Sequence, residues 1–80
     1  MAELPLLRPR NVIRILEGEG YSWRNSRGTD RVYKRVGEGG SRTVTVPTHM
    51  KEVKRGTLRS LLRQAGWSDE EFLKLVEKYR

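Results

Sequence analysis

The sequence predicts an α+β fold in which helices pack on one face of a three-stranded antiparallel sheet. In the middle of the chain, around Val44 and Val46, apolar residues alternate with polar ones, which is typical of a strand with one buried face. On both sides of this region the apolar spacing becomes helical. Glycine-rich segments separate the expected strands. A chain of 80 residues suits one domain, residues 1–80, with a modest core.

The amino-terminal part predicts one short helix. Residues 1–8 have no hydrophobic period, and we expect them to be a loose lead-in. Pro9 suits the first position of a helix because its missing amide hydrogen is not needed there. An apolar stripe follows within residues 12–16, and Gly18 is expected to end the helix.

The next segment predicts a meander of three strands. They are expected at residues 21–24, 29–36 and 42–46. The polar residues 25–28 predict the first turn, and the glycines of residues 37–40 predict a hairpin turn because positive φ angles cost glycine little. Pro47 cannot donate to a strand ladder, so it should end the third strand.

Two helices are expected after the sheet. From Thr57 the apolar residues recur at helical spacing, and Gly66 is expected to end this helix in a left-handed conformation. Ser68 and Glu71 have the spacing of a capping box, which predicts the start of a short C-terminal helix. The predicted order is therefore α-β-β-β-α plus a short C-terminal helix.

The charge is unevenly distributed along the chain. The net charge is +7, and residues 21–63 hold eleven of the seventeen basic residues against three of the ten acidic ones. Such asymmetry in a compact domain indicates a polyanionic partner, most simply nucleic acid. A basic surface that only keeps the protein soluble is the alternative interpretation.

Composition excludes several classes of protein. The chain has no cysteine and a single histidine, which argues against disulfide frameworks, thiolate metal sites and redox centres. We therefore expect no metal and no cofactor. No apolar run approaches the roughly 20 residues of a membrane span, and the first residues lack the pattern of a signal peptide. The expectation is a cytoplasmic protein without a membrane partner.

Two residues are candidates for acid-base chemistry. Histidine changes protonation near neutral pH, so His49 is a possible general base or acid, although a lone histidine after a proline is more often structural. Asp30 lies between Arg27 and Arg31, whose charges favour the ionised carboxylate. An aspartate that orders a turn is the alternative here.

Cationic and aromatic residues suggest how a partner could be bound. A stripe of arginines at i, i+4 and i+8 flanks the apolar side of the helix after Thr57. The candidate phosphate contacts are Arg27, Arg31, Lys51, Lys54, Arg55, Arg59 and Arg63. The aromatic residues Tyr21, Trp23, Tyr33 and Trp67 could stack on bases, but in so small a domain we expect them in the core.

Four segments resemble the HicA toxin family over roughly residues 9–75. They are Gly-Tyr at 20–21, Gly-Thr-Asp-Arg-Val-Tyr at 28–33, Val-Thr-Val-Pro-Thr-His at 44–49 and Gly-Thr-Leu-Arg-Ser-Leu-Leu-Arg-Gln-Ala-Gly at 56–66. The resemblance implies a fold like the double-stranded-RNA-binding domain and a small ribonuclease that cleaves messenger RNA without metal. It also implies a HicB-type antitoxin that covers the active face.

The chain departs from this family at the residue to which its chemistry is assigned. The family's catalytic histidine follows a Gly-Ser or similar pair at the start of the second strand, and here that position is Asp30. Three interpretations remain: Asp30 acts as a weaker base, His49 transfers the proton, or the protein binds RNA without cutting it. The leading hypothesis is an RNA-binding toxin with Asp30 in the catalytic position and His49 in a supporting role. The alternative is a catalytically inactive RNA-binding module or antitoxin-binding protein.

Overall fold

The computed structural model describes residues 4–37 and 39–80 and confirms the predicted α+β fold. Its three strands form one antiparallel sheet in the order β1-β2-β3. The elements are α1 (Pro9–Gly18), β1 (Ser22–Arg27), β2 (Asp30–Gly37), β3 (Gly40–Pro47), α2 (Arg55–Ala65) and α3 (Asp69–Lys78).

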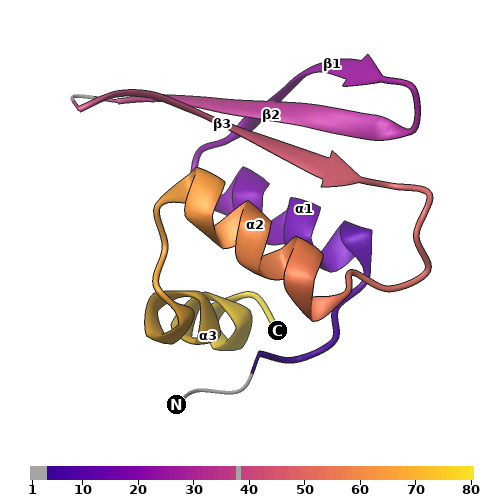
Figure 1. Cartoon of the computed structure of the whole chain (residues 1–80). Helices are drawn as coiled ribbons and strands as arrows, with labels where there is room; N and C mark the ends of the chain where they lie inside the picture. The colour runs from indigo at the N-terminus through magenta and orange to yellow at the C-terminus, as the bar shows by residue number, and fades with distance from the viewer. Residues whose placement is uncertain (1–3, 38) are drawn as a thin grey trace.

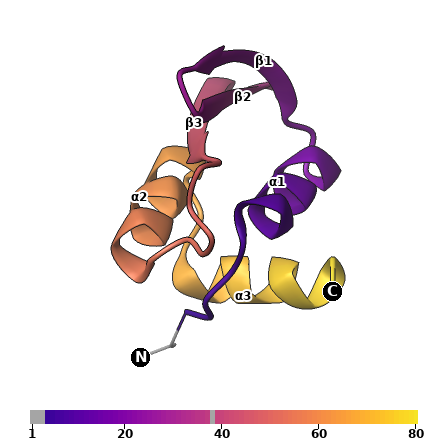
Figure 2. The same ribbon diagram turned by 90° about the vertical axis from the view of Figure 1, so that its right-hand side faces the viewer.

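The elements form three layers. Figure 1 shows the sheet above α1 and α2, and α3 below both of these helices. The quarter turn of Figure 2 shows α1 and α2 side by side under the sheet, with α3 crossing beneath them. The helices pack chiefly against β3, so β1 is the strand farthest from the helical layer. One face of the sheet is therefore covered by helices, as predicted.

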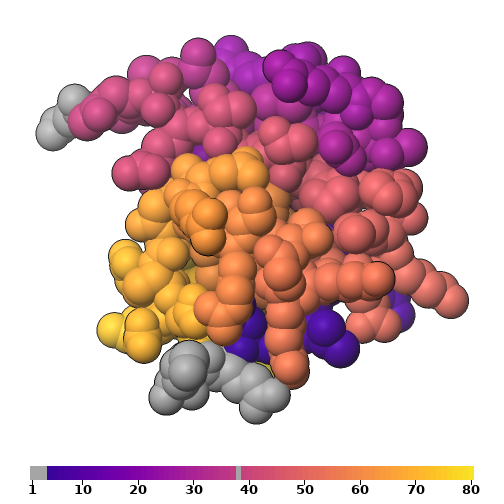
Figure 3. Space-filling view, in the orientation of Figure 1, coloured from indigo at the N-terminus to yellow at the C-terminus, as the bar shows by residue number. Residues whose placement is uncertain are grey.

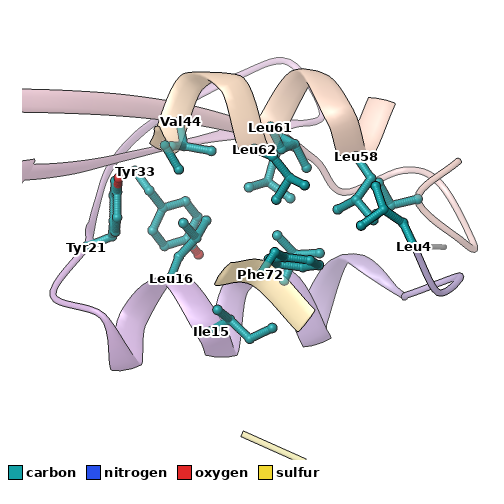
Figure 4. Close-up of a cluster of buried hydrophobic side chains, with 14 residues drawn as sticks. Leu4, Ile15, Leu16, Tyr21, Tyr33, Val44, Leu58, Leu61, Leu62 and Phe72 are labelled. Carbon is teal, nitrogen blue, oxygen red and sulfur yellow. The ribbon is translucent and has the colours of Figure 1, made fainter. Parts of the chain in front are cut away.

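The core lies between the sheet and the two upper helices (Figure 4). Tyr33 and Val44, which are partners in the β2–β3 ladder, are fully buried. Leu58 from α2 and Phe72 from α3 are fully buried as well, so all three layers contribute to one apolar cluster. The alternation in β3 and the helical spacing in α2 supply these side chains, as the sequence predicts.

The first turn is shorter than predicted. Residues 25–27 were expected in the turn, but they belong to β1, where Asn25 pairs with Val32 and Arg27 with Asp30. The ladder continues because the two residues Gly28 and Thr29 are enough to reverse the chain, with Gly28 at a φ of 60°. Polar residues are acceptable in β1 because it is an edge strand and fully exposed.

The remaining boundaries differ by a few residues. The hairpin between β2 and β3 is closed by the pair Gly37 and Gly40, although the Glu38 of the predicted turn lies outside the described residues. Helix α2 begins at Arg55, two residues before the predicted start, because Lys54 is the extended residue that precedes it. Gly66 ends this helix at a φ of 77°, as expected.

The C-terminal helix is anchored at both ends. The Ser68 hydroxyl accepts a hydrogen bond from the Glu71 amide, and the Glu71 carboxylate accepts one from the Ser68 amide, so the predicted capping box is confirmed. At the other end, the Tyr79 hydroxyl donates to Glu19 Oε2 at 2.6 Å, and Lys78 Nζ lies 3.3 Å from the same oxygen. These contacts attach the end of α3 to the end of α1.

These contacts around Glu19 predict a pH dependence of stability. The Tyr79 hydrogen bond, and then Lys78, lower the pKa of Glu19 from its ordinary value of 4.5. Because the pKa of Glu19 is lower in the folded state than in the unfolded state, the ionised carboxylate stabilises the fold. This stabilisation is complete above the pKa of the unfolded state and is lost as the pH falls through the pKa of the folded state. In urea unfolding, Glu19→Gln should therefore have a lower free energy of unfolding than the unchanged protein near neutral pH, and this difference should disappear in acid. Glu17→Gln, at an exposed carboxylate of the same helix, is the control. An equal loss of free energy of unfolding in Glu19→Gln at about pH 7 and about pH 3 would contradict the prediction.

Candidate functional site

Asp30 is the first residue of β2 and lies at one end of the sheet. It pairs with Arg27 of β1 and with Pro47 of β3, so it occupies the centre of the three-stranded ladder. Its side chain is half-buried, and no hydrogen bond or ion pair holds the carboxylate within residues 4–37 and 39–80. The carboxylate is therefore accessible to a ligand.

The chain after β3 is tied to the turn that precedes Asp30. The Thr48 amide donates to the Thr29 carbonyl oxygen at 3.0 Å, and the Thr48 hydroxyl donates to the same oxygen. The Thr29 hydroxyl and His49 Nδ1 are hydrogen-bonded at 3.0 Å. These three hydrogen bonds bring Asp30 and His49, which are far apart in the sequence, to the same end of the sheet.

His49 is exposed and has one ring nitrogen available for other contacts. Thr29 occupies Nδ1, whereas Nε2 has no hydrogen-bond partner in the part of the chain that the structure describes. The contact with Thr29 fixes the ring, so that Nε2 can exchange a proton with a bound ligand. His49 thus combines the structural role expected of a lone histidine with a free acid-base atom.

Cations gather at the same end of the molecule. Arg27 lies opposite Asp30 in the β1–β2 ladder, and Lys51 and Lys54 are exposed on the segment between His49 and α2. In Figure 1 the β1–β2 turn and this segment both lie at the right-hand end of the sheet, and Figure 3 shows their atoms exposed on that side. Together with Arg31, the residue after Asp30, these make four of the predicted cations at this end of the sheet.

The arginine stripe of α2 is less free than the sequence suggests. Arg55 Nε donates to the Leu4 carbonyl oxygen at 3.2 Å, and Arg59 lies 3.2 Å from an Asp69 carboxylate oxygen. The Arg59–Asp69 pair is partly exposed, and such pairs contribute little stability, so Arg59 can exchange its partner at small cost. Arg63 is exposed in the last turn of the helix, at the end away from Lys54.

Three of the four aromatic residues are located as expected, and one is not. Tyr21 and Tyr33 are buried, and Trp67 is half-buried against Tyr21 and Phe72. The prediction of a core position is wrong for Trp23, which is 51% exposed on β1. Its strand is an edge strand far from the helical layer, and a bulge between Trp23 and Asn25 interrupts the ladder there.

Thr29 and Thr48 are the residues of this site that sequence reasoning missed. Both act through hydrogen bonds between segments that are 19 residues apart, and hydrophobic periodicity carries no signal for such contacts. No cluster of three histidine, cysteine, aspartate or glutamate residues that could hold a metal ion occurs among the described residues. Nor does the described chain contain a helix long and apolar enough to cross a membrane.

The fold and the site together define a small α+β protein with a cationic surface around one carboxylate and one imidazole. The sequence model of the HicA toxin of bacterial toxin-antitoxin systems matches residues 9–67, which include every residue of the site. The chain therefore belongs to the HicA toxin family, and the family implies an antitoxin partner. A comparison with curated proteins finds no match.

The hydrogen bond between Thr29 and His49 predicts an energetic coupling between them. In a double-mutant cycle, Thr29→Val and His49→Ala should show a coupling of about 0.5–1 kcal/mol in the free energy of unfolding, because each change alone removes the same hydrogen bond. The control cycle pairs His49→Ala with Thr43→Val, which lies farther along β3. Urea unfolding measures both cycles. Equal coupling in the two cycles would show that the contact does not hold the site.

Proposed function

We propose that this HicA-family protein is the RNA-binding toxin of a toxin-antitoxin pair, and that RNA binds at the Asp30 end of the sheet. The observation that carries the proposal is the set of hydrogen bonds in which the Thr29 carbonyl oxygen accepts from Thr48 and the Thr29 hydroxyl contacts His49. These bonds group an imidazole, a carboxylate and several cations. Cations position the phosphates of a nucleic acid, and groups that accept or donate protons act on the sugar.

The chemistry that fits these groups is metal-independent cleavage of the RNA backbone. A base removes the proton of a ribose 2′-hydroxyl, the oxygen attacks the adjacent phosphorus, and the bond to the 5′-oxygen of the next nucleotide breaks. Asp30 occupies the family's catalytic position and is the candidate base, with His49 Nε2 in the supporting role. Arg27, the ladder partner of Asp30, would stabilise the charge that develops on the phosphate.

A second candidate function is RNA binding without cleavage. It is favoured by the carboxylate at position 30, where the family uses a histidine, because an aspartate is a weak base at neutral pH. The phosphate contacts do not depend on that residue, so binding can persist where cleavage is lost. In both cases the protein partner would be a HicB-like antitoxin, and an acidic surface would complement the cations of this end.

Restoring a histidine at position 30 separates the two functions. Asp30→His should cleave a single-stranded RNA faster than the unchanged protein, because imidazole is a better base near neutral pH. Gel analysis of the RNA, with a chelator present, measures both rates. Asp30→Asn is the control, because it keeps the size of the side chain and removes the base. If both the unchanged protein and Asp30→His leave the RNA intact, the nuclease hypothesis is wrong.

The cations beside the site predict how RNA affinity depends on salt. Lys51→Ala combined with Lys54→Ala should weaken RNA binding, and each lost phosphate contact should flatten the slope of log K against log salt by roughly 0.7 to 0.9. Lys74→Ala combined with Arg80→Ala removes the same charge from the region of α3 and should leave the slope near that of the unchanged protein. Fluorescence anisotropy with a labelled RNA at several salt concentrations measures this slope. Equal slopes for the two double variants would show that Lys51 and Lys54 do not contact the phosphates of the RNA.

A further inference from the structure

Trp23 is a large apolar side chain that the core does not use. It is 51% exposed and lies outside the buried cluster that joins the three layers. Its strand partner Tyr33 is fully buried, so the sheet turns the two side chains toward the same face, but only Tyr33 is covered by the helices. The exposed indole therefore needs an explanation other than packing within this chain.

The indole is held in one orientation. The guanidinium carbon of Arg31 lies 4.1 Å from the centre of the Trp23 ring, so a planar cation covers the ring. The indole Nε1 donates to the Asn25 carbonyl oxygen at 3.1 Å, which limits rotation about the side-chain bonds. A flat surface that is already ordered loses little conformational entropy when a ligand binds to it.

The surroundings of Trp23 are cationic and close to the candidate site. Arg24 and Arg27 lie on the same exposed strand, and Arg31 is the residue after Asp30. Arg27 is the ladder partner of Asp30 and is four residues after Trp23 on the same strand, which corresponds to roughly 13 Å of extended chain. Because side chains alternate between the two faces of a strand, Asp30 points to the face opposite Tyr33 and Trp23, so the indole would be a second contact for the RNA.

We propose that Trp23 and Arg31 form a stacking platform for one unpaired base of the RNA, on the face of the sheet opposite the Asp30 side chain. A half-exposed π surface backed by a guanidinium and flanked by arginines fits a base and its phosphates together, and such stacking accepts any base. An acidic peptide would use the cations and leave the indole face unused. The proposal deepens the proposed function: it rests on RNA binding, and it specifies single-stranded RNA, because the bases of a duplex are stacked on one another.

The two tryptophans allow a direct spectroscopic test. In Trp67→Phe the only remaining indole is Trp23, so its fluorescence reports what contacts the platform. A single-stranded oligouridylate should quench this fluorescence, whereas an abasic ribose-phosphate chain of the same length and an RNA duplex should not. Trp67→Phe keeps an aromatic ring against Tyr21 and Phe72, and circular dichroism checks that it remains folded.

Affinity provides the second readout. Trp23→Ala should weaken binding of the oligouridylate by about 10- to 100-fold and leave binding of the abasic chain unchanged, because the contribution of stacking to one base is lost. Val36→Ala is the matched control: Val36 is 68% exposed on β2 and is not part of the platform, so its removal should change neither affinity.

The outcomes distinguish this inference from the proposed function. If the oligouridylate binds Trp23→Ala as tightly as the unchanged protein, or if the abasic chain quenches Trp23 equally, the platform is refuted while RNA binding stands. If no oligonucleotide binds even in dilute buffer, both proposals fail. If only an acidic peptide binds and quenches Trp23, the surface is a protein interface and the platform is refuted.

Discussion

The candidate site depends on the hydrogen bonds that tie the turn before β2 to the segment after β3. The Thr29 carbonyl oxygen accepts from Thr48, and the Thr29 hydroxyl contacts His49. Without them Asp30 would still begin the middle strand, but His49 and the following lysines would be on a separate loop. The sheet supplies the register that makes the contacts possible, since Asp30 and Pro47 are ladder partners. A few exposed hydrogen bonds thus group the residues of the candidate site at one end of the sheet.

The concentration of cations at this end opposes folding, and the rest of the chain offsets it. Like charges repel, and that repulsion is reduced where arginines have internal partners, as Arg59 has with Asp69 and Arg31 has with the Trp23 ring. The carboxylate of Asp30 adds a negative charge among these cations. The core, where Tyr33, Val44, Leu58 and Phe72 are fully buried, supplies the stability that such a surface requires.

Local chemistry made the fold predictable, and long-range contacts limited the prediction of the site. Gly66 and Ser68 end and begin helices through interactions within a few residues, so their roles follow from the sequence. Trp23 was expected in the core because the domain is so small, but its exposure depends on which strand the helices cover, and no local pattern encodes that. The contact between Thr29 and His49 escaped prediction for the same reason. The arginines of α2 were identified, but their partners Leu4 and Asp69 were not.

In the proposed function, RNA binding and RNA cleavage would depend on different residues. The candidate phosphate contacts are Arg27 and the lysines after His49, and the proposed base contact is Trp23. None of these requires a base at position 30. With Asp30 at the position that the resemblance assigns to the family's histidine, the proposed proton-transfer group would differ while the candidate RNA contacts would remain. A toxin that still holds RNA but cuts it slowly would sequester its target, and an antitoxin that covers the same cations would release it.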